Sequence, residues 1–137
     1  MNRLFIAVLF SVIATSVWAQ SKESPCWKAA RTQSEMNHCA DLDAREAEVD
    51  LNHVYNQLLA KLKADKNATE KLRIAQRAWL AFRDAHMQEL YPAEDKQAEY
   101  GTVFPMCADL ALADLTRQRM KMLKQMLNHV EGEVCSR

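Results

Sequence analysis

The sequence predicts an all-α protein, an antiparallel three-helix bundle with a long first helix, stabilised by a disulfide bond. Three observations support this fold class. The chain of 137 residues contains only 2 glycines and 3 prolines, too few for turn-rich β architectures. Apolar residues recur at helical spacing in three successive segments. All 4 cysteines follow an apolar leader, as expected for an exported protein that forms disulfides.

The leader, residues 1–19, is typical of a cleaved secretory signal peptide. One cation, Arg3, precedes an apolar run over residues 4–12, and the small residue Ala19 ends the segment where a signal peptidase would cleave. The apolar run is shorter than the roughly 20 residues that cross a bilayer. We therefore expect a mature chain of residues 20–137 that is periplasmic or secreted, forms one helical domain and has no stable membrane insertion.

The first helix is predicted over residues 34–65. Thr32 and Glu35 have the spacing of a capping box, in which each side chain binds a backbone N–H near the start of the helix. Apolar residues then recur at steps of three, four or seven, at Met36, Ala40, Ala47, Leu51, Val54, Leu58 and Leu62. At about 1.5 Å per residue the helix would be roughly 48 Å long and would overhang its partners.

The second helix is predicted to start after a short polar break at residues 65–69, where Asn67 and Glu70 repeat the capping spacing. Its apolar face is formed by Leu72, Ala75, Trp79, Phe82, His86 and Leu90. Pro92 ends the helix, because the proline ring disfavours helical geometry at the preceding residue, Tyr91.

The third helix is predicted to start at Cys107, after an irregular connection over residues 91–106, and to end near residues 129–132. Its apolar positions include Ala108, Leu112, Leu115, Met122 and Met126. One short and one long connection between three helices give an up-down-up topology.

This topology restricts how the cysteines pair. Cys26 can fold back over the first turns of the first helix to reach Cys39, and that bond would stabilise the fold by about 3 kcal/mol in the chain-entropy model. Cys107 and Cys135 are separated by a helix about 33 Å long, so their pairing requires a shorter third helix. Otherwise Cys135 is free or joins two chains in a homodimer.

Several classes of function lack support in the sequence. Basic and acidic residues number 18 each, so there is no excess positive charge for binding nucleic acid. Although His38, His86 and the cysteines could ligate zinc, they lack paired ligand spacing, and we expect no metal site and no cofactor. The chain also lacks a nucleophile motif and a glycine-rich phosphate loop, so we expect no catalytic residue and no enzyme activity. Carboxylates on the first helix are best explained as its solvated face.

Two long runs of residues resemble the LprI N-terminal domain family of small exported helical proteins, which is named after a lysozyme inhibitor. The first run contains Cys26, Thr32-Gln33, Glu35-Met36-Asn37 and Cys39, and the second spans residues 75–85 with the pattern A-Q-R-A-W-x-x-F-R-D-A. Asp50-Leu51-Asn52, Tyr55, Cys107, Leu115-Thr116 and Arg119 extend the resemblance over about residues 26–127. The resemblance implies the helical fold and, less directly, inhibition of a lysozyme.

The sequence departs from the family pattern at one place. Family members carry a cysteine shortly after the R-D-A run, where it resembles the partner of the cysteine that opens the last helix. Here His86-Met87 occupies that stretch, so Cys107 lacks its expected partner. Either Cys107 is a buried thiol or Cys135 has replaced the missing cysteine.

Four residues of the second run are expected to have structural roles: Arg77, Trp79, Arg83 and Asp84. Trp79 lies on the apolar face and is interpreted as the core residue at which the three helices meet. We expect Arg83 to form a partly buried ion pair with Asp50, Asp43 or a carbonyl of the first helix. A role for Arg83 as a carboxylate or phosphate receptor is the alternative.

The connection between the last two helices is the candidate binding loop. It combines acidic and aromatic side chains, which suit a basic cleft that reads glycans, at Tyr91, Glu94, Asp95, Glu99, Tyr100 and Phe104. The alternative is a solvated connection whose aromatic residues only fix it to the bundle. The sequence thus predicts an exported protein-binding module that inhibits a lysozyme or another cell-wall hydrolase. A non-catalytic envelope adaptor or an immunity-type protein, either binding another exported protein, is the alternative function.

Overall fold

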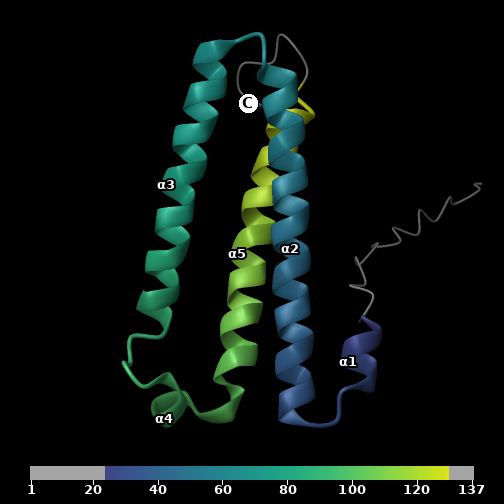
Figure 1. The fold of residues 1–137 in the computed structure, drawn as a ribbon, viewed down its shortest axis with the longest axis vertical. Coiled ribbons are helices and arrows are strands. Elements are labelled where there is room, and N and C mark those ends of the chain that lie inside the picture. The colour runs from purple at the N-terminus through teal and green to yellow at the C-terminus, as the bar shows by residue number, and fades with distance from the viewer. Residues whose placement is uncertain (1–23, 130–137) are drawn as a thin grey trace, which may run out of the picture.

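The computed structural model describes residues 24–129, and Figure 1 shows that three long helices dominate them. The elements in chain order are α1 (Pro25–Ala29), α2 (Gln33–Leu62), α3 (Lys66–Leu90), α4 (Lys96–Tyr100), the 3-10 helix η1 (Gly101–Val103) and α5 (Phe104–Leu127). No strand occurs in this part of the chain, and the all-α class is confirmed. The predicted signal peptide and Cys135 lie outside the described residues.

The start of α2 follows the predicted capping box. Thr32 Oγ1 accepts a hydrogen bond from the Glu35 backbone N–H at 3.3 Å, and Glu35 Oε2 accepts from the Thr32 backbone N–H at 2.9 Å. Arg31 donates its backbone N–H to the same oxygen at 2.7 Å. These bonds lower the pKa of Glu35, the largest effect coming from the Arg31 backbone and the next from the Thr32 backbone. The capping signal in the sequence therefore identified the helix start correctly.

Two predicted helix starts are wrong. Asp65, rather than Asn67, caps α3 and accepts from the Ala68 backbone N–H at 2.9 Å, so Asn67 lies inside the first turn. A carboxylate at this position is favoured by the positive end of the helix dipole. The last long helix starts at Phe104 instead of Cys107, with Pro105 in its first turn, where the missing N–H of proline is tolerated. The connection predicted as irregular contains α4 and η1.

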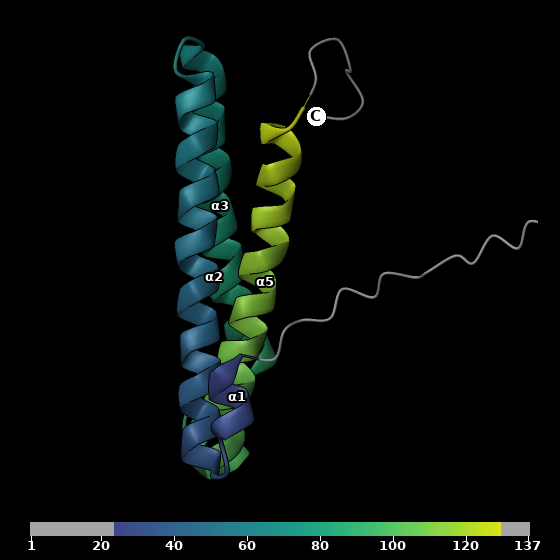
Figure 2. The same cartoon turned by 90° about the vertical axis from the view of Figure 1, so that its right-hand side faces the viewer.

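The three long helices alternate in direction, but they do not pack equally. α2 and α5 lie side by side in both views and share the most extensive contact in the described structure (Figures 1 and 2). In Figure 1, α3 leans away from α2 toward its C-terminal end. One core cluster joins all three helices and consists of Leu51, Val54, Leu58, Leu72 and Leu123. A second cluster of Ala44, Ala47 and Ala113 allows α2 and α5 to approach closely. The core therefore lies mainly between α2 and α5.

The predicted apolar face of α3 is covered only near its N-terminal end. The buried residues of α3 are Leu72 and Gln76, whereas Phe82 is 55% exposed and Leu90 is 44% exposed. Trp79 is half-buried at the margin of the core cluster, so it is not a fully enclosed core residue. The apolar spacing of this face therefore does not correspond to burial at Phe82 and Leu90, which lie beyond Trp79 along α3.

Among the residues that the structure describes, none of the helices combines the length and the apolar composition required to span a bilayer.

Candidate functional site

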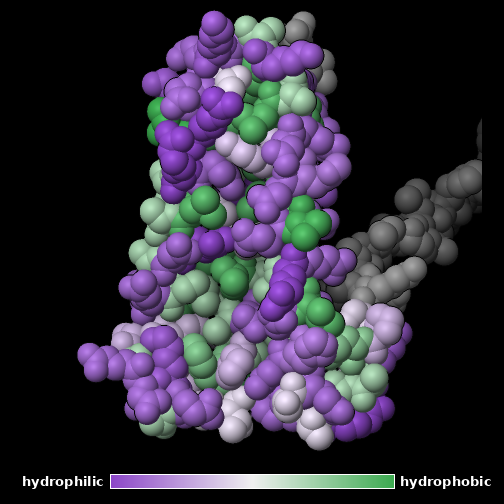
Figure 3. Space-filling view, in the orientation of Figure 1, coloured by the Kyte–Doolittle hydropathy of each residue, from purple (hydrophilic) through white to green (hydrophobic). Residues whose placement is uncertain are grey.

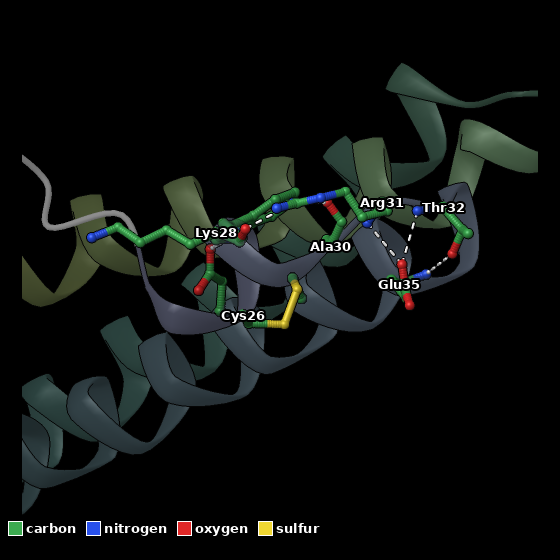
Figure 4. The surroundings of a disulfide bond; sticks show 9 residues. Cys26, Lys28, Ala30, Arg31, Thr32 and Glu35 are labelled. Carbon is green, nitrogen blue, oxygen red and sulfur yellow. Dashed lines mark hydrogen bonds between the residues drawn. A yellow bond between two sulfur atoms is a disulfide. The ribbon is translucent and has the colours of Figure 1, made fainter.

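A disulfide bond and several hydrogen bonds fix α1 to α2. The predicted Cys26–Cys39 disulfide is present, with the two Cα atoms 5.6 Å apart, and Cys39 is buried (Figure 4). On the same short helix, Trp27 Nε1 donates to Asp43 Oδ2 at 2.9 Å. Arg31 closes the turn by donating to the carbonyl oxygens of Lys28 and Ala30, each at 2.8 Å (Figure 4). The N-terminal end of α2 is thus held by one covalent and several polar contacts.

The three aromatic residues of the candidate binding loop pack against one another. The ring centroid of Tyr91 lies 5.5 Å from that of Tyr100 and 5.1 Å from that of Phe104, and the Tyr100 and Phe104 centroids are 5.7 Å apart. Tyr100 Oη also accepts a hydrogen bond from the Ala93 backbone N–H at 3.1 Å. Burial raises the pKa of Tyr91, with smaller contributions from Cys107 and Tyr100. These rings hold the loop together and are only half-exposed.

Lys96 also stabilises the conformation of the loop, a role that was not predicted from the sequence. Its Nζ atom donates to the carbonyl oxygens of Tyr91 and Ala93, each at 2.6 Å. Both carbonyls belong to the chain that leaves the C-terminal end of α3, where a cation also interacts favourably with the helix dipole. A lysine a few residues beyond a helix end is a signal that could have indicated this role.

Asn37 connects the loop to α2. Its Nδ2 atom donates to the Thr102 carbonyl oxygen in η1 at 3.0 Å, and its Oδ1 atom accepts from Gln33 Nε2 at 2.8 Å. The loop and helix α1 therefore lie at the same end of the molecule, where both α2 and α5 begin (Figure 1).

The side chains of the three acidic residues of the loop take no part in the contacts described above. Glu94, Asp95 and Glu99 are all exposed, and none of them forms an ion pair with another described residue. Asp95 caps α4 by accepting from the Ala98 backbone N–H at 2.9 Å. The loop is consequently an ordered platform with an acidic outer surface.

Arg83 forms the predicted partly buried ion pair, but with a different partner. Its side chain is 14% exposed and reaches Glu48 on α2 and Asp84 on α3, each at 3.1 Å. The guanidinium carbon also lies 5.4 Å from the centre of the Trp79 ring. The expected partner Asp43 instead faces α1, where it accepts from Trp27. The other expected partner, Asp50, is exposed.

Arg77 has a more superficial position than Arg83. Its Nη2 atom lies 3.5 Å from Glu70 Oε1, and both side chains are more than half exposed. Because exposed ion pairs contribute little to stability, this contact does not fix the position of α3.

A different arginine, Arg119, makes the polar contact between α5 and α3. Its Nε atom donates to Oε1 of the buried Gln76 at 3.0 Å. Burial lowers the pKa of Arg119. Both residues occur in the family-like motifs, but a sequence pattern gives no indication that they pair. Thr116, one turn earlier on α5, is also buried, and its hydroxyl has no hydrogen-bond partner among the described residues.

Cys107 is a free, half-buried thiol near the start of α5. Within residues 24–129, no group of three or more histidine, cysteine, aspartate or glutamate side chains could hold a metal ion. His86, considered above as a zinc ligand, instead contacts Glu89 Oε2 through Nδ1 at 2.9 Å.

These features define a small all-α protein with a disulfide-fixed N-terminal helix and an ordered acidic loop. The chain belongs to the LprI lysozyme inhibitor family, because the family model described as "Lysozyme inhibitor LprI" matches residues 26–123. The match extends from the disulfide residue Cys26 to Leu123 of the core. The chain is also similar to the uncharacterized protein R02472 of Rhizobium meliloti (strain 1021), with 36% identity over 83% of this chain and 86% of the relative. No solved structure matches the chain.

Proposed function

We propose that this protein is a non-catalytic, exported inhibitor that binds a lysozyme or another cell-wall hydrolase through residues 91–104. Membership of the lysozyme inhibitor family supports the class of target. The choice of this loop as the binding surface is supported by one observation. Glu94, Asp95 and Glu99 are exposed and form no ion pair with the rest of the described structure.

The charge of the loop and its fixed conformation both favour it as the binding surface. A cleft that reads glycans with basic side chains would be complemented by an acidic surface, which accelerates encounter and opposes binding of acidic partners. The aromatic contacts and the two Lys96 hydrogen bonds hold the loop in one conformation before binding. Less conformational entropy is then lost when the complex forms.

The proposal places the protein in the periplasm or outside the cell. Residues 1–19 would be removed as a signal peptide, and residues 20–137 would form one domain built as an antiparallel bundle that opens toward the end of α3. The Cys26–Cys39 disulfide supports an oxidising compartment.

The test is inhibition of several classes of lysozyme by the oxidised protein, measured with cell-wall substrate. The loop variant combines Glu94→Gln, Asp95→Asn and Glu99→Gln, in which asparagine at position 95 retains capping of α4. The matched control combines Glu46→Gln and Asp50→Asn, two exposed acids of α2 without ion pairs in the described structure. We expect stoichiometric inhibition by the natural protein and by the control, and at least tenfold weaker inhibition by the loop variant.

Two results would contradict the proposal in different ways. Equal inhibition by the loop variant would exclude the loop as the binding surface but retain the target class. No inhibition of any lysozyme class would exclude the inhibitor function. Capture of envelope proteins by the oxidised chain would then test the alternative of an adaptor or immunity-type protein.

A further inference from the structure

A pocket lies at the opposite end of the molecule from the acidic loop. It is about 520 Å³ in volume and is formed where the end of α2, the start of α3 and the end of α5 meet. Its apolar walls are Leu58, Leu62, Ala68, Leu72, Ala75 and Met126. Pockets of about 300–1,000 Å³ are typical of sites for small molecules. In Figure 3, apolar residues are exposed between hydrophilic side chains near the upper end of the molecule, where α2 and α3 meet.

The charged residues of this pocket are mainly cations. Lys61, Lys71 and Arg119 line it, and Asp65 is the one acid among the lining residues. Asp65 is already engaged in capping α3. Lys61 Nζ donates to the Leu127 carbonyl oxygen at 2.7 Å, so it holds the end of α5. Lys71 and Arg119 are the other two cations of the lining, which also includes His129.

Arg119 differs from Arg83 in its partners. Arg83 has two carboxylates within 3.1 Å, whereas no carboxylate of the described residues lies within ion-pair distance of Arg119. Its described hydrogen bond goes from Nε to the neutral Gln76 side chain, which leaves the two terminal nitrogens for another acceptor. A cation that is withdrawn from water without an anion is unfavourable, and the lowered pKa of Arg119 has this cause.

We propose that this pocket binds one molecule of a long-chain carboxylate, a free fatty acid. The apolar walls would cover the hydrocarbon chain, and the terminal nitrogens of Arg119 would bind the carboxylate in the two-point geometry that arginine favours. Gln76 would orient the guanidinium group from its Nε side. Lys71 would add positive charge at the rim. The site shares no residue with the loop of the proposed function, so either can fail without the other.

The first measurement is calorimetric titration of the oxidised protein, purified after export with its own leader. Dodecanoate is the ligand and is kept below its critical micelle concentration. Dodecan-1-ol tests the chain without the charge, and acetate tests the charge without the chain. We expect saturable binding of one dodecanoate per protein, with each control compound binding at least tenfold more weakly. Lack of saturable dodecanoate binding would overturn the proposal.

Two pairs of variants separate the charge from the volume of the pocket. Arg119→Gln should weaken dodecanoate binding at least tenfold, whereas Arg117→Gln, the same change on the same helix outside the pocket, should leave it unchanged. Ala75→Trp should block the pocket and also weaken binding at least tenfold, although Arg119 is retained. Its control is Ala78→Trp, at another exposed position of α3 that does not line the pocket.

Circular dichroism determines whether each variant is folded, and Ala75→Trp remains informative if Arg119→Gln unfolds. Unchanged dodecanoate binding by folded Ala75→Trp or Arg119→Gln would overturn the proposal. A parallel titration with vesicles of anionic phospholipid distinguishes the free acid from a membrane surface. Binding to vesicles that neither variant weakens, without binding of dodecanoate, would also overturn it.

Discussion

Arg119 on α5 donates its Nε–H to Oε1 of Gln76 on α3 at 3.0 Å, and this hydrogen bond links the two helices beside their shared core. Gln76 is 7% exposed, so its amide is nearly withdrawn from water. The contact therefore combines a buried neutral acceptor with a half-buried cation. It links Arg119, which lines the apolar pocket, to Gln76 in the buried part of α3.

We expect Gln76→Ala to destabilise the protein by about 1–3 kcal/mol, because it leaves the half-buried Arg119 without its acceptor. Urea unfolding followed by circular dichroism measures the change. Gln88→Ala, at an exposed position of the same helix, should change the free energy of unfolding by less than about 0.5 kcal/mol. Equal stability of the two variants would show that the Gln76 contact contributes nothing.

Loss of the Cys26–Cys39 disulfide should lower stability by about 2–4 kcal/mol, since the crosslink restricts the unfolded chain. The double variant Cys26→Ser/Cys39→Ser tests this in denaturant unfolding. Dithiothreitol should destabilise the natural protein to the same extent and should not affect the double variant. If reduction left the unfolding midpoint of the natural protein unchanged, the disulfide would not be a stabilising element.

Trp79→Ala should cost about 2–3 kcal/mol, less than the roughly 3–5 kcal/mol of a fully buried aromatic residue, because Trp79 is half-buried. The change removes its packing against the core and its contact with the Arg83 guanidinium group. Phe82→Ala is the comparison, since Phe82 is 55% exposed and its truncation should have little effect. A larger loss of stability from Phe82→Ala would contradict the described packing of α3.

Glu35 should make the stability of the N-terminal end of α2 dependent on pH. Its pKa is lowered from the ordinary value of 4.5, mainly by the backbone N–H groups of Arg31 and Thr32. A carboxylate with a lower pKa in the folded state stabilises that state above its unfolded pKa, and this stabilisation is lost as the pH falls through the folded pKa.

The measurement is thermal unfolding from pH 6 downwards. Glu35→Gln should lose less stability than the natural protein as the pH falls below 4.5. Glu46→Gln, at an exposed position of the same helix, should behave like the natural protein. Parallel curves for the natural protein and Glu35→Gln would contradict the role of this carboxylate.

The features that could be predicted from the sequence are those set by neighbouring residues. The capping box at Thr32 and Glu35 and the Cys26–Cys39 bond depend on short spacings, and both are confirmed. The start of α3 was misassigned because Asp65 and Asn67 are both good capping residues, and the sequence contains no further signal that separates them.

Features that depend on distant parts of the chain could not be predicted. The spacing of Trp79, Phe82 and Leu90 indicates an apolar face but not whether another helix covers it. For the same reason, the sequence does not distinguish Arg83, which pairs with carboxylates, from Arg119, which contacts an amide. Both partner sets depend on how α3 lies against α2 and α5.

The alanine contact between α2 and α5 has a consequence for the cooperativity of the fold. Ala44, Ala47 and Ala113 bring these two helices together without any side chain from α3. The half of α3 beyond Gln76 has no fully buried residue, and it is held mainly by the half-buried Trp79 and by the Arg83–Glu48 ion pair, so separating it from the other helices exposes less apolar surface than separating α2 from α5. Amide hydrogens there should exchange through a sub-global opening, well before those of α2 around Leu51. The molecule thus combines a persistent two-helix unit with an arm of lower local stability.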